Sequence, residues 1–173
     1  RYRGDYQALI TALTGHEGRN RQIIEDIAAV AEKGGEATTL VVSDRVSHCT
    51  VFEQALQRRG LKVALLTGQT PADKRAAIVE EVQQGKLQIL VATLQLISEG
   101  FDCPGLSNLF LTTPITFEGR LLQVIGRIMR PAEGKQARVY DYLDHNVSAL
   151  RKSANIRHAT LRREFPTAVL RGN

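Results

Sequence analysis

A polar stripe in the segment 118–130 (EGRLLQVIGRIMR) carries the residue types best suited to chemistry. At about 100° per residue, Gln123, Arg127 and Arg130 fall in one narrow sector of a helix, opposite its apolar residues. Two guanidinium groups on one face repel each other slightly in water, but both can fork onto phosphate oxygens. The stripe predicts a site for the developing charge of phosphoryl transfer, with a solvated surface as the alternative.

The segment 92–104 (ATLQLISEGFDCP) is a second candidate. Thr93 is expected at the end of an apolar strand, and Gly100 can adopt a positive φ in the loop that follows. Asp102 in that loop could accept hydrogen bonds from ribose hydroxyl groups or orient a neighbouring arginine. It could equally cap a turn. Phe101 is expected to anchor the loop in the core.

Small polar residues follow several predicted strands, namely Ser43, Thr67 with Gly68, Thr93, and Thr112 with Thr113. Ligands of open parallel sheets bind at the carboxyl edge, where these residues would meet. They could approach phosphate oxygens there. Hydroxyl groups are also common wherever strands give way to loops, so both readings stay open.

The elements that must position these residues alternate between short β-rich runs and longer runs of helical period, which predicts an α/β fold with a parallel sheet covered by helices. Strands are expected at 38–43, 62–66, 87–92, 108–112 and 137–143, the first four of them buried throughout. Helices are expected at 19–33, 46–59, 71–84 and 118–129, and a final amphipathic helix carries apolar residues from Val147 to Phe165.

The length of 173 residues, with 43% hydrophobic and 24% charged residues, is that of one globular domain. Its predicted parts are a leading segment at 1–37 with a packed helix, a core at 38–144, and a basic helix and tail at 145–173. No apolar run is long enough to span a membrane. Two cysteines exclude a disulfide framework, and we expect His48 and Cys49 to be a packed or surface pair rather than a catalytic dyad.

The net charge of +5 is concentrated in the tail, because residues 145–173 contain six basic residues and one acidic residue. The basic residues there are Arg151, Lys152, Arg157, Arg162, Arg163 and Arg171. They predict either a solvated helix face or a surface that contacts a phosphate backbone. The chain begins at Arg1 and its one methionine is Met129, so we interpret it as a piece of a longer polypeptide, cytoplasmic or nucleoid-associated.

In this order along the chain, the motifs resemble the C-terminal RecA-like domain of superfamily 2 helicases and translocases over about residues 20–145. ATLQLISEGFDCP resembles motif V, and QVIGRIMRP resembles motif VI. TTLVVSDRVSHC resembles motif IV, and LLTGQT with Arg75 resembles the intervening motif. The resemblance implies a three-layer sandwich with helices on both faces of a RecA-like parallel sheet.

The resemblance also implies roles for individual residues. Arg127 and Arg130 would be arginine fingers toward the γ-phosphate of ATP, and Gln123 would contact that phosphate or the attacking water. Gly100 and Asp102 would face the nucleotide. The nucleic-acid strand would meet Ser43, Arg45, Thr67 and Gly68. Thr93 would contact the nucleic-acid backbone or couple the two sites.

The sequence contains neither a GxxxxGK[ST] phosphate loop nor an acidic DExx box, so ATP and Mg²⁺ would be held mainly by an N-terminal RecA-like domain outside this chain. Gln123 stands where DEAD-box RNA helicases usually carry histidine, which favours DNA as the partner. Nine aromatic residues and no tryptophan favour sequence-independent binding to the backbone. The alternatives are a nucleic-acid-binding or regulatory module that keeps the fold without motor activity, and an unrelated nucleotide-binding α/β domain.

Overall fold

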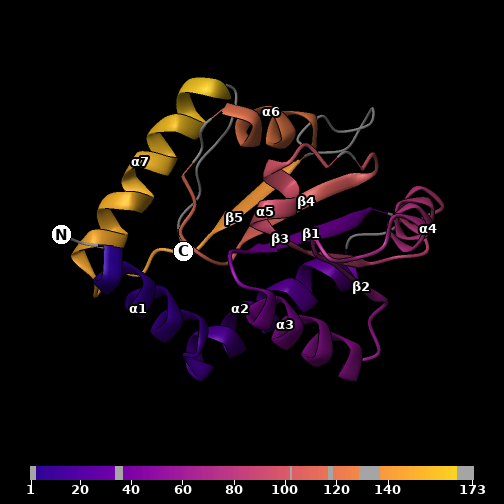
Figure 1. Cartoon of the computed structure of the whole chain (residues 1–173), viewed down its shortest axis with the longest axis horizontal. Helices are drawn as coiled ribbons and strands as arrows, with labels where there is room; N and C mark the ends of the chain where they lie inside the picture. The colour runs from indigo at the N-terminus through magenta and orange to yellow at the C-terminus, as the bar shows by residue number, and fades with distance from the viewer. Residues whose placement is uncertain (1–2, 34–36, 102, 117–118, 129–136, 167–173) are drawn as a thin grey trace.

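The computed structural model describes residues 3–33, 37–101, 103–116, 119–128 and 137–166. Its helices and strands alternate along most of the chain (Figure 1). The strands are β1 (Thr38–Ser43), β2 (Val63–Leu66), β3 (Ile89–Thr93), β4 (Leu106–Leu111) and β5 (Arg138–Asp141). The helices are α1 (Arg3–Thr14), α2 (Glu17–Lys33), α3 (Val46–Arg58), α4 (Ala72–Gln83), α5 (Leu94–Ser98), α6 (Gly119–Ile128) and α7 (Ser148–Glu164).

The five strands form one parallel sheet in the order β2-β3-β1-β4-β5, which confirms the predicted fold class. Val42 of β1 pairs with Ala92 of β3 on one side and with Leu111 of β4 on the other. Because all strands run the same way, their carboxyl ends meet at one edge. The polar residues that follow β1, β2, β3 and β4 therefore share that edge, as predicted.

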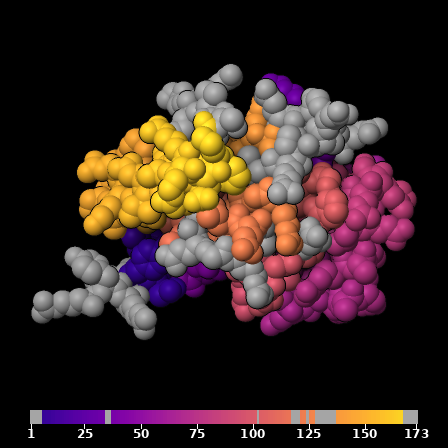
Figure 2. All heavy atoms as spheres, turned by 90° about the horizontal axis from the view of Figure 1, so that it is seen from above, coloured from indigo at the N-terminus to yellow at the C-terminus, as the bar shows by residue number. Residues whose placement is uncertain are grey.

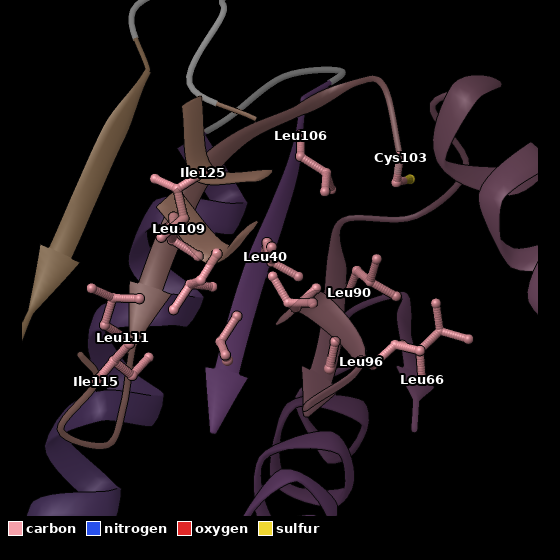
Figure 3. Close-up of a cluster of buried hydrophobic side chains, with 14 of the residues drawn as sticks. Leu40, Leu66, Leu90, Leu96, Cys103, Leu106, Leu109, Leu111, Ile115 and Ile125 are labelled. Atoms are coloured by element: carbon pink, nitrogen blue, oxygen red, sulfur yellow. The ribbon is translucent and has the colours of Figure 1, made fainter. Parts of the chain in front are cut away.

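Two layers of helices cover the sheet, and alternate residues of the central strands face opposite layers. Val41 and Phe110 pack against α2 and α3, where Phe52 is fully buried. Leu40, Leu90 and Leu109 face the other side, toward α4, α5 and α6 (Figure 3). Burying a side chain such as Phe52 contributes about 1.5–3 kcal/mol each time, so the two clusters hold the sheet rigid beneath its carboxyl edge.

The prediction that the first four strands are buried throughout is wrong for β2. Val63, Ala64 and Leu65 are only half-buried, and Leu66 alone is buried. The reason is the place of β2 at the edge of the sheet, where β3 is its one strand neighbour. An apolar run does not distinguish a central strand from an edge strand.

Two helices were not expected from the sequence. The five-residue α5 follows β3 directly and is too short to show a helical period. The longer α1 buries Ile10 and leaves Tyr6 exposed, so its apolar pattern is weak. Within the described ranges, no helix combines the length and the apolar character that crossing a bilayer requires.

Candidate nucleotide and nucleic-acid interface

Helix α6 separates its apolar and polar residues as the sequence predicts. Leu121 and Ile125 are buried against the sheet, whereas Gln123 and Arg127 are exposed. The spacing of four residues puts Gln123 and Arg127 on the same side of the helix. Arg130 lies outside the described residues. A Cβ at Gly126 would meet no atom within 4 Å, so the space beside the stripe is open.

Within the described part of the chain, neither the Gln123 nor the Arg127 side chain takes part in a hydrogen bond or an ion pair. A guanidinium group without a carboxylate partner keeps its full capacity to bind an anion. The exposed stripe is therefore chemically suited to a phosphate that comes from outside the chain.

The loop after α5 brings the next predicted residues to the same side of the sheet as α6. Gly100 adopts a φ of +93°, a conformation that other residues rarely reach, and its amide donates a hydrogen bond to the Ile97 carbonyl at 3.2 Å. Phe101 packs against the core cluster, which confirms it as an anchor. Asp102 lies outside the described residues.

The carboxyl end of β1 is held by a buried chain of hydrogen bonds. Ser43 Oγ lies 2.8 Å from His48 Nδ1, and His48 Nε2 lies 2.8 Å from Asn20 Oδ1. The Arg45 amide donates to Ser43 Oγ at 3.2 Å. Burial, with a smaller effect of the Arg19 charge, lowers the pKa of His48 to about 4. A neutral His48 with its proton on Nε2 satisfies every one of these contacts.

These contacts place Ser43 and His48 beneath the surface. His48 packs on Phe52 and Cys49 is fully buried, which confirms a packed pair rather than a catalytic dyad. Burial also raises the pKa of the Cys49 thiol to about 12. The Ser43 hydroxyl is buried and bonded, so Ser43 could act on a nucleic acid only through the loop that it supports.

The other residues predicted to contact nucleic acid lie just after β1, in the turn after β2 and at the end of β3. Arg45 is half-buried, and its guanidinium donates to Gln7 Oε1 of α1, while its Nε is buried without a partner among the described residues. Thr67 begins a turn in which the Thr70 amide donates a hydrogen bond to the Thr67 carbonyl at 3.1 Å, and Gly68 in that turn is exposed. Thr93, at the end of β3, is buried.

A second, partly buried network, which sequence reasoning missed, holds the end of β4. Arg19 of α2 donates to the Thr112 carbonyl at 2.7 Å and to both carboxylate oxygens of Asp144 at 2.8 and 3.1 Å. The Asp44 amide donates to Thr113 Oγ1 at 3.0 Å. Arg19 and Asp144 are 125 residues apart, and no local sequence pattern marks such a pair.

Helix α7 lies beside the sheet (Figure 1) and at the surface (orange to yellow in Figure 2), and it corrects one prediction. Arg157 is not part of a basic outer face, because its side chain is only 2% exposed and binds both carboxylate oxygens of Asp141 at 2.9 and 3.1 Å. The exposed cations of α7 are Arg151, Lys152, Arg162 and Arg163. Arg171 lies outside the described residues.

Comparisons with known proteins agree with this arrangement. The family model described as helicase conserved C-terminal domain matches residues 19–132. The ATP-dependent DNA helicase uvsW of Enterobacteria phage T4 is 28% identical over 151 residues, which cover 87% of this chain and 30% of that protein. The UvrABC system protein B of Thermotoga neapolitana is 25% identical over 141 residues, which cover 79% of this chain and 20% of that protein. The chain thus spans well under half the length of these relatives.

Solved structures share the fold. The crystal structure of T4 UvsW superposes with a TM-score of 0.74 at 23% identity and covers 92% of this chain and 35% of that one. The C-terminal domain of the DEAD-box protein Dbp5 superposes with a TM-score of 0.62 at 20% identity. The match covers 83% of this chain and 79% of that one. The predicted RecA-like architecture is confirmed.

Proposed function

Because the chain belongs to the family of helicase conserved C-terminal domains, we propose that it is the second motor domain of an ATP-dependent DNA helicase or translocase of superfamily 2. The observation that carries this proposal is the exposed stripe on α6, where Arg127 and Gln123 have no partner among the described residues. A surface of this kind is complete only when an anion from another domain meets it.

The residues of the stripe fit a nucleotide phosphate. When bound, ATP with Mg²⁺ supplies the phosphoryl group that is transferred to water, and both are held mainly by an N-terminal RecA-like domain of the same polypeptide. Arg127 offers a planar guanidinium group that can fork onto phosphate oxygens. Gln123 can donate and accept hydrogen bonds, which suits it to orient a water molecule. Arg130, Gly100 and Asp102 complete this proposed contact surface.

The nucleic acid would lie across the carboxyl edge of the sheet. Thr67 and Gly68 offer a turn whose exposed glycine lets a sugar-phosphate backbone approach closely. Arg45 offers a cation at the same edge, and Ser43 and Thr93 support the loops from below. The relative named uvsW is an ATP-dependent DNA helicase, which supports DNA over RNA as the substrate.

The motor step follows from the two surfaces being on one rigid domain. Pairing of Arg127 with a phosphate held by the other domain favours closure of the two domains, and loss of that phosphate after hydrolysis removes the attraction. Because the carboxyl edge belongs to the same sheet that α6 packs on, each closure would shift the residues that contact the DNA backbone along with the domain. The chain alone is proposed to be inactive.

The decisive test is Arg127→Ala in the complete polypeptide. Arginine fingers contribute roughly 10³ to 10⁵ in rate where they have been measured, so DNA-stimulated ATP hydrolysis should fall by at least that lower factor, while DNA binding without nucleotide persists. The matched control is Arg58→Ala, which removes an exposed arginine from α3 on the other face of the sheet. Unchanged hydrolysis in Arg127→Ala would contradict the motor proposal and favour a non-motor nucleic-acid-binding module.

A further inference from the structure

A pocket of about 340 Å³ opens at the carboxyl edge of the sheet, and neither the nucleotide surface nor the predicted nucleic-acid contacts account for it. Its lining includes Tyr6 of α1, Asp44 after β1, Leu94 and Ser98 of α5, and Pro114 and Ile115 after β4. Asp44 and Leu94 directly follow Ser43 and Thr93. The pocket therefore adjoins the edge of the sheet where the nucleic-acid strand is proposed to lie. Ligand sites of parallel sheets form at such a position.

The charge of the pocket excludes a phosphate as its preferred occupant. Of the described residues that line it, Asp44 is the one charged residue, and none is basic. No cation of the described residues forms an ion pair with the Asp44 carboxylate. An exposed carboxylate repels an anion and accepts hydrogen bonds from N–H groups. The occupant should therefore be neutral and carry N–H donors.

The residues that line the pocket suit contact with an aromatic ring. Tyr6 is 41% exposed, which leaves it accessible for contact, and Leu94, Pro114 and Ile115 provide apolar surface. Burial, and to a smaller degree the Asp44 charge, raises the pKa of Tyr6, so its hydroxyl stays protonated. Ser98 already donates its hydroxyl proton to the Leu94 carbonyl at 2.8 Å, which leaves its oxygen as an acceptor.

The position of these groups is set by contacts outside the pocket. The Asp44 amide donates to Thr113 Oγ1 at 3.0 Å, which fixes the start of the loop after β1. Ile10 is buried, and Gln7 accepts a hydrogen bond from the Arg45 guanidinium, so α1 is tied to the same loop. Tyr6 and Asp44 are thereby held on neighbouring elements at the mouth of the pocket.

We infer that this pocket receives one nucleobase of the bound strand, stacked against Tyr6, with its amino group donating to the Asp44 carboxylate. Cytosine, adenine and guanine carry such an amino group, whereas thymine does not. The inference rests on the proposed function, because a nucleobase reaches the pocket only if the strand lies along this edge. It adds one base-dependent contact to a grip that otherwise depends on the backbone.

The test compares three single-stranded oligonucleotides of equal length and charge with the complete polypeptide: oligo-dC, oligo-dT, and an abasic sugar-phosphate strand. By the usual size of base–aromatic stacking, oligo-dC should bind about tenfold more tightly than the abasic strand, measured by fluorescence anisotropy. Tyr6→Ala should remove most of that advantage and Tyr6→Phe should keep it. Asp44→Asn should bring the affinities for oligo-dC and oligo-dT closer together.

The controls separate this inference from the proposed function. Val51→Ala, which trims an exposed side chain on α3, should leave all three affinities unchanged. Equal affinity for oligo-dC and the abasic strand, or a base preference that survives in Tyr6→Ala, overturns the pocket while DNA-stimulated ATP hydrolysis can remain intact. A polypeptide that binds none of the strands and hydrolyses no ATP in their presence overturns both.

Discussion

The polar side chains at the strand ends form hydrogen bonds within the chain, whereas those on the outer face of α6 have no such partner among the described residues. At the ends of β1 and β4, Arg19, Asn20 and His48 make buried or partly buried hydrogen bonds within the chain. On α6, Gln123 and Arg127 point to solvent with no partner among the described residues. Buried polar groups that are fully bonded rigidify a structure, whereas unpaired surface charges contribute little to it. The carboxyl edge is thus preorganised by the chain itself, whereas the α6 face is open to the nucleotide phosphate that we propose it binds.

The largest effect that separates the two regions should come from replacing one arginine in each. Arg19→Met leaves the Asp144 carboxylate and the Thr112 carbonyl without the partly buried donor that they share, which should lower the free energy of unfolding by about 4 kcal/mol. Arg127→Met removes an exposed charge and should change it by less than about 0.5 kcal/mol. Urea denaturation of both variants measures the difference. Equal losses would show that α6 is as strongly integrated as the strand ends.

A somewhat smaller effect on the free energy of unfolding should come from His48 at the end of β1, and it should depend on pH. The pKa of His48 is about 4 in the folded chain, against about 6.5 in an unfolded chain. Between these values the unfolded chain binds more protons, so the stabilisation is fully present above pH 6.5 and is lost as the pH falls toward 4. The loss should approach about 3 kcal/mol.

The variant His48→Gln isolates this contribution, because glutamine keeps hydrogen-bonding groups but does not titrate in this range. Thermal or urea unfolding measured between pH 7 and 4.5 should show a steeper loss of stability in the original chain than in the variant. The two curves would run parallel if His48 were already protonated in the folded state, and the buried chain from Asn20 to Ser43 would then need another account.

The difference between the two regions also explains what the sequence could predict. The period of α6 and the apolar runs of the strands are local patterns, so the strand and helix bounds expected between residues 19 and 143 came within two residues of those observed. The exposed sides of Gln123 and Arg127 follow from the same period. The pairing of Arg19 with Asp144 and of Arg157 with Asp141 depends on how distant elements pack. The sequence shows an arginine in each case but not whether a carboxylate covers it.

The smallest effect on stability, and the sharpest on DNA binding, is expected from the outer face of α7. Its exposed cations Arg151, Lys152, Arg162 and Arg163 are proposed to contact the DNA backbone, while the buried Arg157 holds α7 to β5 and must be retained. Neutralising the four with glutamine in the complete polypeptide should leave the unfolding curve nearly unchanged. The dependence of log affinity on log salt concentration should become shallower by about one for each phosphate contact removed.

A matched variant distinguishes a local contact from the general loss of positive charge. Neutralising Arg21, Lys33, Arg58 and Lys62 removes the same charge from exposed positions on and around α2 and α3, across the sheet from α6. If α7 touches the DNA, its variant flattens the salt dependence and this control does not. Equal flattening in both would mean that the tail acts only through net charge, and an unchanged slope in the α7 variant would remove α7 from the DNA-binding surface. In either case the grip would rest on the carboxyl edge, whose preorganised loops need no help from the tail to hold their shape.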